Sequence, residues 1–321
     1  MASEQLFEIA RRTFDAPEFR GIECIEVEAR SVLNHVAGNR MPFDWTINPY
    51  RGCMHACVYC FARPTHTYLD MNAGKDFETR IVVKVNAPDV LRRELAAKRW
   101  KGEHIAMGTG TDPYQRVEGR YRLMRGIIEA LIDHRNPFSI LTKGTLITRD
   151  LDLLVRAAEH APVSAAFSIG TLDEQVWHDT EPGTPSPKAR IEAVRTLVDA
   201  GIPTGVLMAP VLPGISDRPE QLRAVVEAAI DAGASHVSPI MLHLRPGVRE
   251  EFLPWLQETH PDLVGRYEKL YGTSYGPKGE RDQLSRRVAA MTRGRTTGTS
   301  SFRRSPRAAR PDPPAEQPQL W

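Results

Sequence analysis

The sequence has 321 residues, of which 41% are hydrophobic and 26% are charged, and its formal net charge is +2. This size and composition predict a soluble α/β protein with a sizeable core, and they exclude a chain too polar to bury one. No run approaches the roughly 20 apolar residues of a membrane-spanning helix. The first 19 residues lack the apolar segment of a secretion signal, so we expect a cytoplasmic protein with no membrane partner.

Residues 1–44 are predicted to form an N-terminal extension that packs on the main domain. Within it, residues 6–14 (LFEIARRTF) and 31–36 (SVLNHV) are interpreted as short helices, and residues 21–29 (GIECIEVEA) as an extended stretch. The extended stretch contains Cys24. We expect this cysteine to be structural, because free cysteine is often simply buried.

Residues 45–250 alternate apolar, strand-like runs with longer amphipathic runs and are predicted to form the main domain. This alternation implies βαβ units with a parallel sheet, either a partial barrel or an open doubly wound sheet. Any site is then expected at the carboxyl ends of the strands. The strand candidates are 45–48, 104–110, 138–142, 163–170, 203–210 and 235–242, and the helix candidates between them are 89–100, 122–134, 149–160, 186–201 and 218–233.

Residues 251–291 are predicted to be a C-terminal helical region, with one or two helices over residues 249–272. Residues 292–321 are rich in Gly, Ser, Thr, Arg and Pro and are predicted to be a disordered tail. From Thr273 to Trp321 there are ten Lys or Arg residues against four Asp or Glu residues, a local charge of +6. Such a basic end could contact nucleic acid, although a solvated end is the interpretation that the composition favours.

Four cysteines are present, and three of them fall within eight residues, in the segment NPYRGCMHACVYCFARP (48–64). Close spacing of this kind indicates metal or redox chemistry in a reducing compartment rather than disulfides. Pro49 and Gly52 bend the chain before the first of them. The spacing C-x3-C-x2-C is carried by Cys53, Cys57 and Cys60.

Three interpretations of this spacing are open. One face of a helix would carry all three cysteines, but a straight helix would spread the outer two over about 10 Å. A zinc site usually has four ligands, and either His55 or His66 would have to supply the fourth. An iron–sulfur cluster of the cubane type is commonly held by four thiolates, so three thiolates leave one iron open to a small molecule.

The cysteine spacing, with Tyr59 just before the last cysteine and a strand before the first, resembles the signature of the radical S-adenosylmethionine (SAM) superfamily. Within it, the chain is most similar to the spore photoproduct lyase-related group, over about residues 45–245. The resemblance implies a partial (β/α)6 TIM-like barrel. The stretches that carry it, besides the cysteine segment, are GTGTDPYQ (108–115), LTKGT (141–145), SIGT (168–171), EPGTPSPKAR (181–190) and APVLPGISD (209–217).

The same resemblance implies an enzyme with two cofactors, a [4Fe–4S] cluster and S-adenosylmethionine. Cys53, Cys57 and Cys60 would be the cluster ligands. An electron from the cluster would cleave S-adenosylmethionine to methionine and a 5′-deoxyadenosyl radical, which takes a hydrogen atom from a substrate that the sequence does not identify. The implied electron source is a low-potential donor such as flavodoxin or ferredoxin. The protein would position the cofactors and exclude water and oxygen.

Other positions receive roles from the resemblance. Tyr59 would lie near the adenine, and the backbone of Gly108, Thr109 and Gly110 would meet the methionine amino group. Lys143 would pair with the methionine carboxylate, for which its compact charge is suited. Ser168 would bind the ribose or the carboxylate.

Several polar residues at expected strand ends have weaker assignments. The role of Asp112 is open, and Glu181 is interpreted as a turn or cap residue. Tyr114, Gln115 and His243 are candidates to face substrate, with a structural role favoured for each. No catalytic residue is assigned on the substrate side.

One departure from the resemblance concerns the hydrogen donor. Spore photoproduct lyase uses a cysteine in the barrel, but no cysteine follows Cys60 here, and only Cys24 remains. Repair of thymine dimers by that route is therefore not expected unless Cys24 folds into the barrel or a tyrosine substitutes. The alternative function is a non-catalytic zinc or iron–sulfur binding module, with nucleic acid as a candidate partner.

Overall fold

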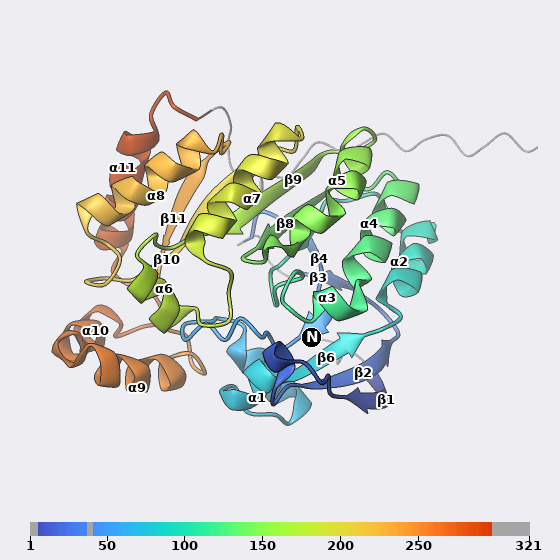
Figure 1. Cartoon of the computed structure of the whole chain (residues 1–321), viewed down its shortest axis with the longest axis horizontal. Coiled ribbons are helices and arrows are strands. Elements are labelled where there is room, and N and C mark those ends of the chain that lie inside the picture. Colours follow the sequence, from blue (N-terminus) through green and yellow to red (C-terminus); the bar gives the residue numbers. More distant parts are fainter. Residues whose placement is uncertain (1–5, 37–40, 297–321) are drawn as a thin grey trace, which may run out of the picture.

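A computed structural model describes residues 6–36 and 41–296 of the chain (Figure 1). Its main element is a seven-stranded sheet with the order β11-β10-β9-β8-β7-β4-β3. Six of these strands pair in parallel, which confirms the six predicted strands and the partial barrel. They are β4 (Trp45–Ile47), β7 (Ile105–Met107), β8 (Phe138–Thr142), β9 (Val163–Ser168), β10 (Thr204–Val211) and β11 (Val237–Met241).

The strands are apolar almost throughout because helices cover the outer face of the sheet, as Figure 1 shows for α4, α5, α7 and α8. Ser186 caps α7 by accepting a hydrogen bond from the amide of Ala189, and Gly201 and Gly233 adopt positive φ angles after helix ends. The five predicted helices are α2 (Ala87–Ala96), α4 (Leu123–Asp133), α5 (Leu151–Ala158), α7 (Pro187–Asp199) and α8 (Pro219–Asp231).

A second sheet of four strands, in the order β1-β2-β6-β5, was not anticipated. It consists of β1 (Leu6–Arg12), β2 (Glu23–Ala29), β6 (Arg80–Lys84) and β5 (Tyr50–Arg51). The helix predicted over residues 6–14 is therefore wrong, because β1 pairs antiparallel with β2. The helix predicted over residues 31–36 is also wrong, because β3 (Leu33–His35) pairs with β4. The extended stretch around Cys24 is confirmed as β2.

The second sheet and the barrel share one continuous core, in which Cys24 and Ile81 from the sheet belong to the same cluster as Ile105 and Phe167 from the barrel. Hydrogen bonds also join them, since Tyr121 of α3 donates to Glu26 of β2 at 2.9 Å. Because β5 ends at Arg51, the second sheet fixes the chain just before the first cysteine of the motif.

Beyond the barrel, residues 249–272 are helical as predicted, with α9 (Arg249–Thr259) and α10 (Val264–Leu270), and α11 (Lys278–Thr292) follows. Most of the predicted disordered tail lies outside the described residues, and the proposed domain boundaries remain predictions. None of the helices within the described ranges is both long and apolar enough to cross a membrane. Short elements complete the order: α1 (Lys75–Thr79), α3 (Glu118–Tyr121), α6 (Glu174–Thr180), and 3-10 turns at Pro17–Phe19, Arg63–Leu69, Thr145–Asp150 and Pro261–Leu263.

Candidate functional site

The three clustered cysteines lie on an irregular loop, not on a helix. Gly52 enters the loop with φ +79°, and an added Cβ there would lie 2.9 Å from the carbonyl oxygen of Phe77. That same carbonyl accepts a 2.8 Å hydrogen bond from the amide of Cys53. Ala56 also has a positive φ of 51°, a conformation that a helix cannot contain. The helical-face interpretation of the spacing is therefore wrong.

Side chains from the end of β7 hold the first half of this loop. The carbonyl of Gly52 accepts hydrogen bonds from Thr111 Oγ1 at 2.7 Å and from Gln115 Nε2 at 3.0 Å. Gln115 Oε1 in turn accepts from the amide of Met54 at 2.9 Å. Gln115 is fully buried. It is thus a structural support of the cysteine loop rather than a residue that faces substrate.

The three thiols are free, and Cys53 and Cys57 are buried while Cys60 is partly exposed. Burial raises the pKa of Cys53 and Cys60 and raises the pKa of Cys57 to about 12, so without metal the thiols are neutral. A bound metal would reverse this, since a coordinating thiol is deprotonated. Three soft sulfur donors on one buried loop fit an iron–sulfur cluster.

Each of the two histidines that could supply a fourth zinc ligand uses one ring nitrogen in another contact. Nδ1 of His55 lies 3.3 Å from Asp112 Oδ2, and Nε2 of His66 lies 3.0 Å from the carbonyl oxygen of Arg80. Within residues 6–36 and 41–296, no group of three or more His, Cys, Asp or Glu side chains, the three cysteines included, is already arranged to hold a metal ion. The fit to an iron–sulfur cluster therefore rests on the three sulfur donors and their spacing. Neither histidine, as placed, completes a four-ligand zinc site with the cysteines.

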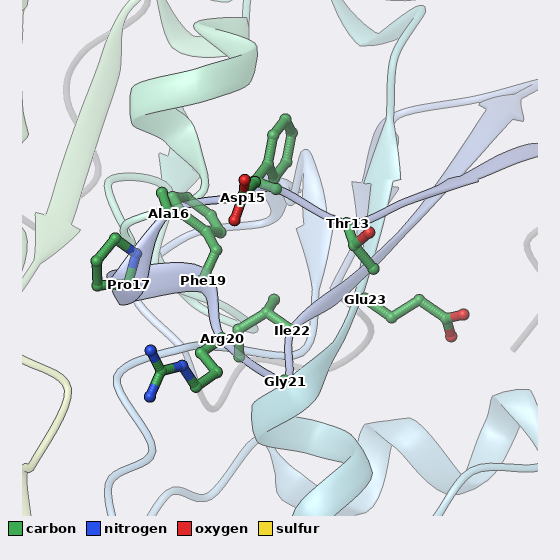
Figure 2. A pocket seen from close by; sticks show the side chains of 10 residues that line it. Thr13, Asp15, Ala16, Pro17, Phe19, Arg20, Gly21, Ile22 and Glu23 are labelled. Atoms are coloured by element: carbon green, nitrogen blue, oxygen red, sulfur yellow. The ribbon is translucent and has the colours of Figure 1, made fainter.

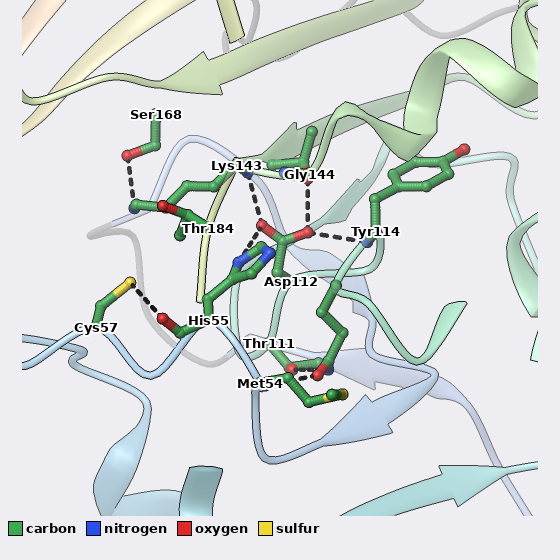
Figure 3. Close-up of polar contacts among 12 residues, drawn as sticks. Met54, His55, Cys57, Thr111, Asp112, Tyr114, Lys143, Gly144, Ser168 and Thr184 are labelled. Carbon is green, nitrogen blue, oxygen red and sulfur yellow. Dashed lines mark hydrogen bonds and ion pairs between the residues drawn. The ribbon is translucent and has the colours of Figure 1, made fainter. Parts of the chain in front are cut away.

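Asp112 joins the ends of β7 and β8 to the cysteine loop (Figure 3). Its carboxylate accepts from Thr142 Oγ1 at 2.6 Å and from the amides of Lys143 at 2.6 Å and Tyr114 at 2.9 Å, and its other contact is with His55. Burial alone would raise the pKa of Asp112, but His55 and these hydrogen bonds together lower it to about 2. The sequence left the role of Asp112 open. In the structure its carboxylate connects the ends of β7 and β8 to the cysteine loop.

The glycine segment 108–110 follows β7 at the carboxyl edge of the sheet. Gly108 has φ +86°, and a Cβ on it would lie 1.8 Å from the carbonyl oxygen of Leu141 on β8, so no other residue fits. The amide of Gly110 donates to Asn48 Oδ1 at 3.1 Å, just after β4. Thr109 lies between them and is half-buried. The segment exposes backbone, without bulky side chains, beside the loop.

Lys143 and Ser168, at the ends of β8 and β9, are in direct contact. Lys143 Nζ donates to Ser168 Oγ at 2.8 Å (Figure 3). Ser168 Oγ in turn donates to the carbonyl oxygen of Ala209 on β10 at 2.7 Å. The Lys143 ammonium also lies 5.6 Å from the centre of the Tyr59 ring. These contacts bring together three residues that the sequence predicted as cofactor-binding.

A buried polar network behind Tyr59 was missed by the sequence reasoning. The Tyr59 hydroxyl donates to Glu181, and Glu181 forms an ion pair with Arg190 at 2.5 Å. Arg190 also donates to the carbonyl oxygen of Ser168 at 2.7 Å. Burial would raise the pKa of Glu181, but Arg190 and Lys143 lower it overall. Glu181 does end α6, as its cap assignment predicted, yet its carboxylate connects the cysteine loop to β9.

Among the remaining candidates, Tyr114 contacts the cluster only through its amide, which donates to Asp112, and its side chain is buried. The other two lie apart from the cluster. His243, two residues after β11, packs against Tyr275 with ring centres 4.7 Å apart. Cys24 belongs to β2 in the second sheet and not to the barrel.

A surface pocket of about 470 Å³ is lined by residues 13–17 and 19–23, around the connection from β1 to β2 (Figure 2). Its lining includes Phe14, Phe19 and Arg20 but none of the cysteines and none of the strand-end residues. We therefore identify the candidate site with the cysteine loop and the carboxyl ends of the strands, where the polar side chains converge.

Comparison with known proteins agrees with this geometry. An uncharacterized protein of Mycobacterium tuberculosis (strain ATCC 25618 / H37Rv) is 49% identical over 282 residues, which cover 87% of this chain and 83% of the relative. An uncharacterized protein of Methanocaldococcus jannaschii is 34% identical over 197 residues, which cover 61% of this chain and 70% of the relative. A radical SAM Nα-GlyT isomerase of Pseudomonas phage M6 is 27% identical over 59% of this chain, but over only 37% of its own length.

Among solved structures, a spore photoproduct lyase variant with bound AdoMet and dinucleoside spore photoproduct has a TM-score of 0.68 and 18% identity. The match covers 92% of this chain and 86% of that one, and it shows a shared fold. The family model described as "Radical SAM superfamily" matches residues 47–237, which include the cysteine loop and the whole of the parallel strands β7, β8, β9 and β10. The chain is thus an enzyme of the radical SAM superfamily, which uses a [4Fe–4S] cluster and S-adenosylmethionine for radical chemistry.

Proposed function

We propose that Cys53, Cys57 and Cys60 hold the [4Fe–4S] cluster and that the enzyme reductively cleaves S-adenosylmethionine. The products are methionine and a 5′-deoxyadenosyl radical, which takes a hydrogen atom from a substrate that is still to be identified. The observation that carries the proposal is the buried, non-helical loop with three thiols at the carboxyl ends of six parallel strands. When bound, the cluster supplies an electron and an open iron for the methionine amino and carboxylate groups.

The residues around the loop are suited to bind and orient S-adenosylmethionine. The Lys143 ammonium, which already donates to Ser168, offers charge-assisted hydrogen bonds to a carboxylate. The backbone carbonyls of Gly108, Thr109 and Gly110 are candidates to accept from the methionine amino group, whereas the amide of Gly110 already donates to Asn48 Oδ1. The Tyr59 ring, fixed by its hydrogen bond to Glu181, is a rigid surface for the adenine.

The electron source that we propose is a low-potential protein such as flavodoxin or ferredoxin. Cys60 supports this proposal because it is the most accessible of the three cysteines. A nucleic acid remains a weaker candidate partner, and its basis is the local charge of +6 from residue 273 onward.

The test begins with anaerobic purification, cluster reconstitution and reduction with dithionite. Wild-type protein is expected to form 5′-deoxyadenosine from S-adenosylmethionine, and Cys57→Ala is expected to form none. Cys24→Ala, which removes a cysteine of the second sheet, is the matched control and should keep the activity. Protein that binds zinc and assembles no iron–sulfur cluster would instead support the non-catalytic metal-binding alternative.

A further inference from the structure

Arg63 is a buried cation directly behind the cysteine loop, and none of the roles assigned so far includes it. Its side chain is 2% exposed and begins three residues after Cys60. Burial of an arginine is costly unless every N–H of the guanidinium has a partner and the charge is compensated. The surroundings of Arg63 meet both requirements, and the contacts show which parts of the chain the guanidinium connects.

All five N–H groups of the guanidinium are used. Nε and one terminal nitrogen both donate to the carbonyl oxygen of Cys57, at 3.2 and 3.0 Å. The other terminal nitrogen donates to the carbonyl oxygens of Ala73 and Gly74, at 3.1 and 3.3 Å. The fifth N–H is directed at the carboxylate of Glu78, which is partly exposed.

These contacts fix two of the three cysteines relative to each other. The forked hydrogen bond holds the backbone of Cys57. The guanidinium also lies 5.5 Å from the centre of the Phe77 ring, and the carbonyl of Phe77 accepts from the amide of Cys53. A lysine could not replace the fork, because an ammonium offers three donors from one point instead of five in a plane.

The charge of Arg63 also acts on the loop. The guanidinium donates to the carbonyl oxygen of Cys57 at 3.0 Å, so its positive charge lies directly against the ligand loop. Adding an electron to a cluster held by three thiolates increases the negative charge in a buried site. A buried cation nearby makes that addition more favourable, whereas the carboxylate of Glu78 opposes it.

We propose that Arg63 is a positioning residue for the cluster, with two separable effects: its fork fixes the geometry of the ligand loop, and its charge raises the midpoint potential of the cluster. This inference rests on the proposed ligand set. It does not depend on cleavage of S-adenosylmethionine, because its readouts are the rate of cluster loss to a chelator and the potential in an EPR-monitored titration with dithionite.

The experiment compares Arg63→Gln, Arg63→Lys and Glu78→Gln in anaerobically reconstituted protein. Both Arg63 variants are expected to lose iron to the chelator about 10-fold faster or more, as changes around metal ligands typically do. Arg63→Gln should shift the midpoint potential to a more negative value, and Arg63→Lys, which keeps the charge, should shift it less. Glu78→Gln should shift the midpoint potential to a more positive value. This shift is opposite to that of Arg63→Gln, and a mere loosening of the loop in both variants would not produce opposite shifts.

Arg92→Gln is the matched control, since Arg92 lies on α2 at the surface and its removal should change neither readout. A folded Arg63→Gln protein with the wild-type potential and rate of iron loss would overturn the proposal. If Arg63→Gln fails to fold, the other two variants test the proposal: Glu78→Gln tests the charge effect and Arg63→Lys tests the positioning effect. A shift of Glu78→Gln to a more negative potential, or none, would overturn the charge effect, and wild-type iron loss in Arg63→Lys would overturn the positioning effect. Absence of 5′-deoxyadenosine with these shifts intact would count against the proposed function alone.

Discussion

Lys143 is the residue whose surroundings are most directly suited to a carboxylate ligand. Its ammonium is half-buried between Ser168 Oγ and the Tyr59 ring, and Glu181 lies near enough for a favourable charge interaction. Loss of one charge-assisted hydrogen bond costs about 1.5–3 kcal/mol. We therefore predict that Lys143→Met weakens S-adenosylmethionine binding about 10- to 100-fold in equilibrium dialysis.

Lys188→Met is the control for this measurement, because Lys188 forms an exposed ion pair with Glu174 on the outer helices. It should bind S-adenosylmethionine as the wild type does. An unchanged dissociation constant in Lys143→Met would show that the carboxylate is bound elsewhere.

Gly108 has no room for a side chain, and this steric effect can be measured separately from the effect of its positive φ angle. An added Cβ would lie 1.8 Å from the carbonyl oxygen of Leu141, and the φ of +86° adds its own penalty. Gly102 has a similar φ of +71° but no atom within 4 Å of the same position. We predict that Gly102→Ala costs about 1–2 kcal/mol of unfolding free energy, whereas Gly108→Ala costs more than about 4 kcal/mol or prevents folding.

Urea unfolding of the metal-free proteins measures this difference. Equal losses at the two positions would mean that β7 and β8 separate easily, contrary to the close approach seen here.

At the scale of elements, the barrel could be predicted from the sequence because its signals are local. Each buried parallel strand is a short apolar run, and each helix has its own amphipathic period. The second sheet lacked such signals, since β5 has two residues and β2 pairs with β6 some 57 positions away in the chain. The helices suggested near residues 6–14 and 31–36 did not form, because antiparallel pairing of β1 with β2 and of β3 with β4 overrode the local pattern.

The same distinction applies to the site. The cysteines could be identified because their spacing is contained in one segment. Their supports could not, since Asp112 meets His55 and Glu181 meets Tyr59 only after the strands have assembled. Arg63 is close to the cysteines in sequence, yet its role depends on where the chain returns at Ala73, Gly74 and Glu78.

Asp112 makes the ends of β7 and β8 sensitive to acid. Its pKa is about 2 in the folded protein against an ordinary value of 3.8, so the folded state favours the carboxylate. The stabilisation is fully present above the unfolded value near pH 4 and is lost as pH falls toward 2. The shift corresponds to about 2 kcal/mol.

We predict that Asp112→Asn lowers the free energy of unfolding at pH 7 by at least about this amount, and that its difference from the wild type narrows between pH 4 and pH 2. Urea unfolding of both proteins between pH 2 and pH 7 measures this difference in unfolding free energy. A pH-independent difference in unfolding free energy between Asp112→Asn and the wild type would indicate that packing, not charge, dominates.

On the scale of the whole molecule, the two sheets are connected through a buried carboxylate. Glu118 is fully buried, accepts from Tyr50 of β5, and pairs with Arg149 at 2.6 Å. It also accepts from the amides of Leu123 and Met124 at the start of α4. The segment that leads into the cysteine loop is thus anchored to the helical layer of the barrel as well as to the second sheet.

This arrangement places Cys24 where it cannot serve the barrel. It lies fully buried in β2, between β1 and β6, and burial raises its pKa to about 11. A thiol of this kind is unreactive, because the thiolate is the reactive form. We predict that native protein resists alkylation of Cys24 by iodoacetamide, as measured by peptide mass spectrometry, and that labelling appears only with urea unfolding.

The same placement bears on the reaction. If Cys24 supplied hydrogen to a substrate radical, it would need to approach the strand ends, and the second sheet would have to open. Cys24→Ala is therefore expected to keep the wild-type turnover once a substrate is known, and to form 5′-deoxyadenosine at the wild-type rate before then. Turnover lost in Cys24→Ala, with 5′-deoxyadenosine still formed, would mean that the two sheets separate during catalysis. Turnover retained would mean that the hydrogen donor is another group, such as a tyrosine or the 5′-deoxyadenosine that took the hydrogen atom from the substrate.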